Sequence, residues 1–267
     1  MIDATNRNQT LLDEITSTYL IYTILHIISI KLSCKMNSHQ RTITPRVFAQ
    51  YLVAVVVIPF LPLLISWRWD WWEGWVFAII YIMGFAISRM LAARLHPDLI
   101  AERARLLQHE DTKPWDKVLA PLVLLGIGLI PMFAGLDALF GWSSTFSVPL
   151  KVLALIIILA GYALGSYALI ENRFFSVMVR LQTERGHHVV SSGPYRWMRH
   201  PGYAGALWSN LAVPLFLDSA WAFLPAAFLT IVLVIRTSLE DRTLQDELTG
   251  YRDYARRVRY RLLPGVW

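Results

Sequence analysis

The residues best suited to chemistry gather in one short stretch, residues 191–205, with the sequence SSGPYRWMRHPGYAG. It combines two prolines, two tyrosines and a histidine between segments that are mostly apolar. Pro201 disfavours helix at His200 and suits the first position of a following helix. We therefore expect a helix to begin at Pro201, with unpaired N–H groups that point back at the loop. Such a helix start favours an anion, for example a carboxylate.

Residues 187–190, with the sequence HHVV, precede this stretch and are bounded by glycine and serine. We expect them to be extended, so that their backbone N–H and C=O groups could read the edge of a purine ring. Zinc is not predicted here, because adjacent histidines project differently and the sequence has neither a nearby cysteine nor an HExxH motif.

A second stretch runs from residue 235 to the end of the sequence. On a helix of about 100° per residue, six of its side chains fall within an arc of about 80°. Arg236 and Glu240 are neighbours one turn apart, and the plain alternative is an ion pair on an exposed helix end. Gly250 is expected to weaken the end of this helix. The six side chains are Arg236, Glu240, Thr243, Glu247, Tyr251 and Tyr254.

Three further carboxylates, Glu102, Glu110 and Asp111, lie in a long basic loop. We expect them to balance the neighbouring cations Arg103, Arg105 and Lys113 on an interfacial helix rather than to take part in catalysis.

At the two stretches the sequence resembles the isoprenylcysteine carboxyl methyltransferase family and the related phospholipid methyltransferases. The segment GPYRWMRHPGYAG is similar to the family's Gly-x-Tyr…Arg-His-Pro-x-Tyr-x-Gly signature. The segment RTSLEDRTLQDELTGYRDY is similar to its C-terminal pattern of Arg-x3-Glu, an acidic pair, Leu, Gly and Tyr-x2-Tyr. The resemblance covers about residues 170–267.

The resemblance implies a membrane-integral enzyme that takes its methyl group from S-adenosylmethionine. Family members bind this cofactor in a cytoplasm-facing pocket among membrane helices, without a Rossmann fold. Glu240 matches an acidic cofactor contact and Arg236 a substrate contact, and these two are the candidate catalytic residues. The other implied cofactor contacts are His187, His188, Val189, Val190, Tyr195, His200, Pro201, Gly202 and Tyr203.

The sequence departs from the family pattern in places. The acidic pair is Glu240-Asp241 where Glu-Glu is common, and the interval from Leu244 to Gly250 is one residue longer than usual. Gly202 stands where serine is common, which removes a hydroxyl contact.

The rest of the chain must hold these stretches in a membrane. Of its 267 residues 55% are hydrophobic and 16% charged, against about 25% charged in a soluble domain. About 20 apolar residues cross a bilayer core, and tryptophan, present 11 times, favours membrane interfaces. We expect an all-α polytopic membrane protein with about six transmembrane helices, the last two forming a hairpin. Their ranges are 47–66, 72–93, 117–139, 148–170, 203–217 and 220–237.

Basic residues alternate between the connections of these helices. The segment before the first helix, the loops after the second and fourth and the C-terminal tail are rich in Lys and Arg, whereas the other three connections hold only Arg68 and Lys151. By the positive-inside rule both termini and the candidate site lie in the cytoplasm, at the inner membrane if the protein is bacterial. The net charge of +6 is therefore a topology signal and not a sign of nucleic-acid binding.

We divide the chain into an N-terminal segment (1–45), transmembrane helices (46–170) and a catalytic region (171–267). The apolar run at residues 19–30 is too short to span a bilayer, so the first segment is predicted to be cytoplasmic or interfacial and dispensable. The single cysteine, Cys34, excludes an internal disulfide framework.

The sequence leaves the methyl acceptor open beyond a lipid-like or amphiphilic molecule. A carboxylate is ionised near pH 7 and needs no general base, so positioning and an anion contact at Arg236 would suffice. A lipid amine would need a base, for which Asp241 or Glu247 is the nearest candidate. Two further classes stay open: a sterol-type membrane reductase that uses NADPH, and a non-catalytic membrane partner protein of another enzyme.

Overall fold

The computed structural model describes residues 53–96, 99 and 111–267, all of which belong to one unit, Pro45–Trp267. The predictions for residues 1–45, including the run at 19–30 and Cys34, lie outside the described residues. The three-part division of the chain stays a prediction.

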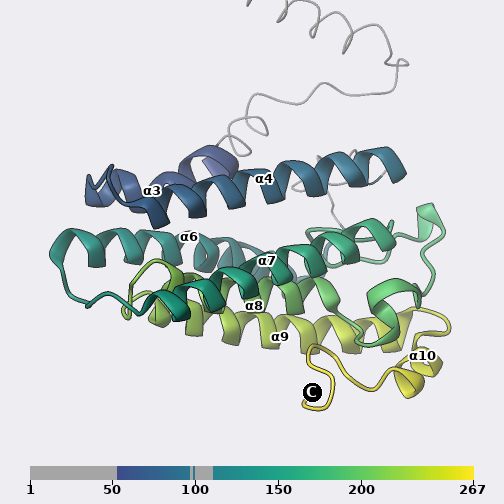
Figure 1. The fold of residues 1–267 in the computed structure, drawn as a ribbon. Coiled ribbons are helices and arrows are strands. Elements are labelled where there is room, and N and C mark those ends of the chain that lie inside the picture. Colours follow the sequence, from purple (N-terminus) through teal and green to yellow (C-terminus); the bar gives the residue numbers. More distant parts are fainter. Residues whose placement is uncertain (1–52, 97–98, 100–110) are drawn as a thin grey trace, which may run out of the picture. The chain divides into compact units, whose positions relative to one another are not determined.

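Helices make up the regular structure of the described residues, and the predicted all-α class is confirmed. In Figure 1 the long helices lie side by side along one common direction. The elements are η1 (Val53–Val57), α3 (Ile58–Ser66), α4 (Trp72–Leu95), α6 (Asp116–Phe140), α7 (Val148–Glu171), η2 (Thr183–Arg185), η3 (Gly193–Arg196), α8 (Pro201–Phe216), α9 (Phe223–Glu247) and α10 (Tyr251–Arg257).

Four helices, α4, α6, α7 and α9, are long and apolar enough to cross a membrane. Helix α3 has only 9 residues and α8 only 16, so the count of six spans stays a prediction, as does the orientation. The predicted hairpin of the last two helices is present: α8 ends at Phe216 and α9 begins at Phe223. Helix α9 continues ten residues beyond the predicted end at 237.

Close contact between α7 and α8 depends on glycine. A Cβ atom on Gly205 would lie 2.5 Å from the carbonyl oxygen of Gly161 and 2.8 Å from the nitrogen of Gly165. Both neighbours are backbone atoms that a side chain cannot push aside. Small residues at such a contact let two membrane helices approach closely, so we refer to Gly161, Gly165 and Gly205 as the α7–α8 seam.

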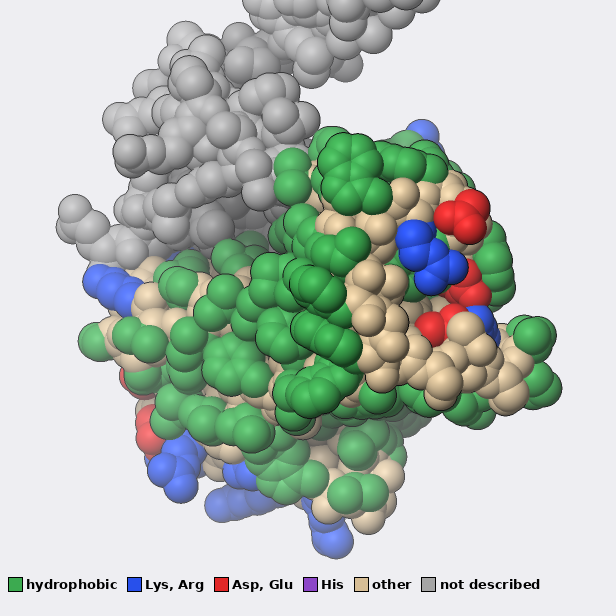
Figure 2. Space-filling view, turned by 90° about the vertical axis from the view of Figure 1, so that its left-hand side faces the viewer, with side chains coloured by type: hydrophobic (Ala, Val, Ile, Leu, Met, Phe, Trp, Pro, Cys, Tyr) green, Lys and Arg blue, Asp and Glu red, His purple; other side chains and the backbone are tan. Residues whose placement is uncertain are grey.

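One end of the bundle carries exposed aromatic side chains. Trp67, Trp69, Trp72, Trp142 and Trp221 are between 47% and 74% exposed, and all lie in or next to the α3–α4, α6–α7 and α8–α9 connections. Figure 2 faces this end and shows hydrophobic side chains over most of it. Tryptophan favours the interface of membrane and water, so these side chains suit an end of the bundle that lies near a membrane surface.

A buried ion cluster lies beneath these aromatic side chains. The Lys151 Nζ atom lies 2.5 Å from Glu73 Oε1 and 2.5 Å from Asp218 Oδ2, and Asp218 also accepts a hydrogen bond from the Phe146 backbone N–H. The cluster therefore joins the first turns of α4 and α7 to the α8–α9 connection. We refer to Lys151, Glu73 and Asp218 as the far-end cluster.

Candidate active site

Among the described residues, two cavities meet at the end of the bundle opposite the far-end cluster. The upper pocket, about 90 Å³, is lined by the loop after α7, the start of α8, the end of α9 and α10. The lower cavity, about 320 Å³, lies inside the bundle between α4, α6, α7, α8 and α9 and is lined mainly by apolar side chains. Both are bordered by Phe175, Ser176, Gly202 and Tyr203, which we refer to as the dividing wall.

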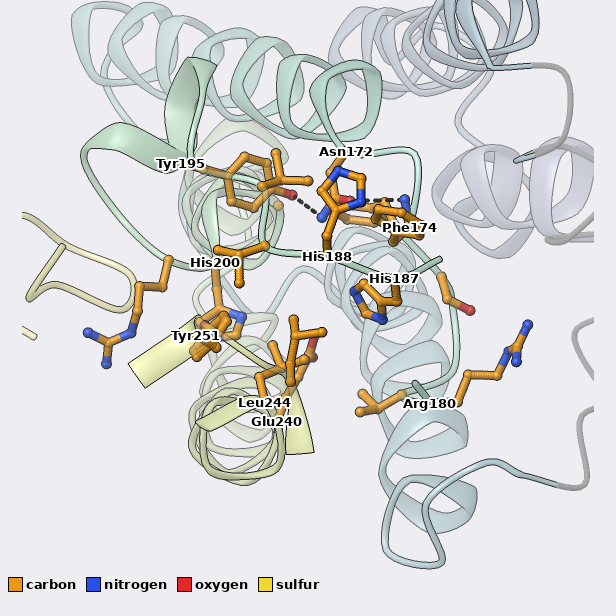
Figure 3. A pocket seen from close by; sticks show the side chains of 18 of the residues that line it. Asn172, Phe174, Arg180, His187, His188, Tyr195, His200, Glu240, Leu244 and Tyr251 are labelled. Atoms are coloured by element: carbon orange, nitrogen blue, oxygen red, sulfur yellow. Dashed lines mark hydrogen bonds between the residues drawn. The ribbon is translucent and has the colours of Figure 1, made fainter. Parts of the chain in front are cut away.

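Most residues predicted to bind a cofactor line the upper pocket. Figure 3 shows His187 and His188 on one side of it and Glu240 with His200 on the other. Pro201 does not line it and instead begins α8, as predicted. The predicted residues that line the pocket are His187, His188, Val189, Val190, Tyr195, His200, Gly202, Tyr203 and Glu240.

Asp241 does not line the upper pocket itself but contacts three residues that do, Arg199, His200 and Tyr251. Its carboxylate is fully buried and accepts a bidentate pair of hydrogen bonds from Arg199, at 2.7 and 2.9 Å. It also receives hydrogen bonds from Arg261 and Tyr251, and the His200 Nε2 atom lies 3.3 Å away. Burial, and then the Asp241 carboxylate, raises the pKa of Tyr251, so its hydroxyl stays protonated. Asp241 is fully engaged and is not available as the general base considered for an amine acceptor.

The start of α8 offers fewer free donors than predicted. The backbone N–H groups of Tyr203 and Ala204 both donate to the His200 carbonyl at 3.1 Å. The N–H of Gly202 is then the first-turn donor left without a partner among the described residues. The prediction of several unpaired N–H groups is wrong, because the chain tightens into a hydrogen-bonded turn at His200.

Gly202 is required by its neighbour in the dividing wall. A Cβ atom at this position would collide with the ring of Phe175, at 2.5 Å from its Cζ atom. The departure from serine therefore makes room for an aromatic ring, and the family pattern did not indicate this.

The loop carrying the two histidines has no regular structure, and strand is not assigned at residues 187–190. Burial, and next the charges of His188, Arg185 and Arg180, lower the pKa of His187 from 6.5 to about 4. His187 is therefore neutral near pH 7 and adds no positive charge to the pocket. Its ring packs on Phe174, with 4.6 Å between the ring centres.

Arg236 and Glu240 have different surroundings although they are one turn apart on α9. Glu240 lines the upper pocket and accepts a hydrogen bond from the Tyr203 hydroxyl at 2.6 Å. Arg236 lines the lower cavity and forms a bidentate ion pair with Asp116, at 2.7 and 2.9 Å. The alternative of a simple Arg236–Glu240 ion pair is wrong, because the guanidinium is paired with α6 instead.

The remaining carboxylates of the sequence prediction lie elsewhere. Glu247 bonds to Lys113 at 2.7 Å and lines neither cavity, so it is not placed to act as a base. Asp111 pairs with Arg180, a cation that the sequence prediction did not name. Glu102 and Glu110 lie outside the described residues.

Tyr251 and Tyr254 reach the upper pocket by a route that the helical arc did not predict. Helix α9 ends at Glu247, and Gly250 has a φ of 83°, a left-handed conformation that favours glycine. The chain turns there, and both tyrosines enter the pocket wall from α10. The sequence reasoning missed Phe174 and Phe175, whose only signal was two aromatic residues in a polar loop.

Fold and site define a helical membrane protein with a polar pocket above an apolar cavity. Residues 153–246 match the model of the Isoprenylcysteine carboxyl methyltransferase (ICMT) family, which confirms the predicted family resemblance over this part of the chain. The chain is also 36% identical over 62 residues to the "Uncharacterized protein YpbQ" of Bacillus subtilis (strain 168). That similarity covers 23% of this chain and 37% of YpbQ, so the chain matches little more than a third of its relative's length. The family match and the four apolar helices support a membrane methyltransferase.

The upper pocket fits the functional groups of S-adenosylmethionine. The Glu240 carboxylate suits an ammonium group, and the Gly202 N–H suits a carboxylate. The backbone N–H groups of Val189 and Val190 have no hydrogen-bond partner among the described residues and could bond to a ligand. Neutral His187 avoids repulsion of a sulfonium cation.

Proposed function

We propose that this chain transfers a methyl group from S-adenosylmethionine to the carboxylate of a lipid-like acceptor, as in isoprenylcysteine carboxyl methylation. One observation carries the proposal. Glu240 and Arg236 line two different cavities that share the dividing wall. A cofactor held above this wall and an acceptor held below it would meet there.

Tyr203 separates the two roles within the wall. Its hydroxyl is bonded to Glu240, while its ring lies 5.4 Å from the guanidinium carbon of Arg236. Glu240 is thereby oriented toward the upper pocket and Arg236 stays in the lower cavity. We assign Glu240 to the cofactor ammonium and Arg236 to the acceptor carboxylate.

S-adenosylmethionine, when bound, supplies an electrophilic methyl group on a sulfonium. The chain's own contribution is positioning: Arg236 holds the acceptor anion, and the apolar lower cavity takes its hydrocarbon tail. The ring of Phe175, which borders both cavities, would keep water away from the wall. No proton has to move, since a carboxylate is ionised near pH 7.

The contacts of the site disfavour an amine methyltransferase and an NADPH-dependent reductase. An amine acceptor needs a general base, yet Asp241 is saturated with donors and Glu247 lies at the surface. NADPH needs cations for its phosphates, but Arg199 is bonded to Asp241 and Arg180 to Asp111 and Glu184.

The test uses purified full-length protein in detergent micelles with methyl-labelled S-adenosylmethionine. Two acceptors are offered separately, farnesylated N-acetylcysteine and phosphatidylethanolamine. We expect label in the farnesylated compound as a methyl ester that alkali cleaves. Alkali-stable label in phosphatidylethanolamine alone would establish the amine class instead, and no cofactor binding at all would indicate a non-catalytic partner protein.

Variants then separate the two roles. Glu240→Gln should weaken cofactor binding at least tenfold, about 1.4 kcal/mol, because the ammonium loses its charged partner. Arg236→Gln should leave the cofactor dissociation constant within twofold and lower turnover of the farnesylated acceptor. Arg242→Gln, an exposed change on the same helix, is the matched control and should alter neither quantity.

A further inference from the structure

Asp116 is a buried carboxylate that the two chemistry-bearing stretches do not contain. It lies in the first turn of α6, outside the family-matched residues, and its side chain is fully buried. Fully buried carboxylates are rare unless they are paired. Its contacts therefore call for an explanation.

Both oxygens of Asp116 are used. Oδ1 accepts from Arg236 Nε at 2.7 Å, and Oδ2 accepts from Arg236 Nη2 at 2.9 Å and from the Val179 backbone N–H at 2.6 Å. Arg236 Nη2 also donates to the Val177 carbonyl at 2.5 Å. The guanidinium plane is thus fixed on one edge by α6 and by the loop after α7.

This arrangement leaves one part of the guanidinium for a ligand. Nε and Nη2 are occupied, while Nη1 has no hydrogen-bond partner among the described residues. Arg236 is only 5% exposed and lines the lower cavity. A bidentate pair fixes an arginine more rigidly than a single charge does, so the direction of Nη1 is set by Asp116.

We propose that Asp116 is a positioning residue that aims Nη1 of Arg236 at the acceptor anion. The inference rests on the proposed role of Arg236 in acceptor binding. Asp116 itself does not line either cavity, so it acts only through the arginine. Because the pair is neutral overall, the acceptor is selected by a directed N–H group rather than by a free positive charge.

The experiment compares Asp116→Asn, Asp116→Glu, Arg236→Gln and the double variant Asp116→Asn/Arg236→Gln. The readouts are kcat/KM for farnesylated N-acetylcysteine and the dissociation constant of S-adenosylmethionine, on protein shown to be folded. We expect each Asp116 variant to lower kcat/KM at least tenfold with the cofactor constant within threefold. The double variant should be no worse than Arg236→Gln alone, because one residue acts through the other.

Asp137→Asn is the matched control. Asp137 is a buried carboxylate at the other end of the same helix, and it accepts hydrogen bonds from Ser143 and Ser219. It should lower the melting temperature and leave kcat/KM of the folded protein unchanged. Asp116→Glu keeps the charge and carries the test if the Asn variant does not fold. Wild-type kcat/KM in Asp116→Glu would overturn the inference, since a counter-charge alone would then suffice. Unchanged kcat/KM in Arg236→Gln would instead refute the proposed acceptor role itself.

Discussion

The two ends of the bundle contain buried ion clusters of similar chemistry and different surroundings. At the far end Lys151 pairs with both Glu73 and Asp218, and none of the three lines either cavity. At the site end Asp241 and Asp116 each hold an arginine, and their partners line the two cavities. The far-end cluster joins helix ends beneath exposed aromatic rings, whereas the site-end pairs shape cavity walls.

The comparison shows that a buried ion pair is not by itself a sign of function. Desolvation offsets much of the attraction in such a pair, while removal of one partner leaves a costly unpaired charge. Both ends therefore matter for folding. A pair next to a cavity can also affect ligand binding. Measuring stability and binding separately tests whether it does.

The largest effect is expected from removing the central charge at each end. Asp241→Asn and Lys151→Met should each lower the free energy of unfolding by about 3–5 kcal/mol, because buried partners lose their counter-charge. Cofactor affinity of the folded protein should fall only in Asp241→Asn, measured by calorimetry beside chemical unfolding in micelles.

Asp246→Asn is the control for that comparison, since Asp246 and Arg252 form an exposed pair with side chains 67% exposed. It should change neither property. Loss of cofactor affinity in folded Lys151→Met would remove the distinction between the two ends.

A smaller effect is expected at the α7–α8 seam, which connects both ends. Gly205→Ala places a Cβ atom against the backbone of Gly161 and Gly165, so the helices must separate. We expect a loss of about 1–3 kcal/mol in unfolding free energy. Gly128→Ala is the matched control on α6, where a Cβ atom would meet no atom within 4 Å; equal stability of the two variants would contradict a close-packed seam.

Tyr203→Phe tests the dividing wall with an effect on the site end alone. It removes the 2.6 Å hydrogen bond to Glu240 while keeping the ring beside Arg236. Cofactor binding should weaken about tenfold, or about 1.4 kcal/mol, with little change in melting temperature. Tyr260→Phe, an exposed change, should bind like the wild type; if Tyr203→Phe does so too, the hydroxyl does not orient Glu240.

The smallest effect is a pH dependence from His187. Its pKa falls from 6.5 to about 4 on folding, so the unfolded chain takes up this proton first as the pH drops. Above about pH 6.5 neutral His187 makes its full contribution to the free energy of unfolding. This contribution is lost as the pH falls from there toward pH 4. His187→Gln should have a shallower decline of melting temperature over that window and no difference in slope above it. Identical slopes would show that His187 is not held neutral.

Much of the fold followed from local patterns in the sequence. The apolar runs predicted helices because about 20 apolar residues suffice to cross a bilayer, and the four ranges 72–93, 117–139, 148–170 and 203–217 match α4, α6, α7 and α8 to within two residues at each end. The first range, 47–66, lies partly outside the described residues, and its described part is divided between η1 and the short helix α3. For the last range the difference lies at α9, whose polar end at 238–247 was not predicted as helix. Pro201 marked the start of α8 correctly, because a proline restricts the residue before it and tolerates the first helical position.

The sequence by itself also determined most of the side chains that line the upper pocket, since the two stretches carry recognisable residue types at a set spacing. Tertiary structure alone decided what those side chains contact. Asp116 meets Arg236 across 120 positions of sequence, and Asp241 collects donors from the loop, α9, α10 and the tail. Such contacts depend on how the helices pack, for example at the α7–α8 seam. Packing joins residues that are far apart in the sequence, and a local sequence pattern does not encode it. The assignment of Glu240 to one cavity and Arg236 to another therefore arises only when α8 inserts Tyr203 between them.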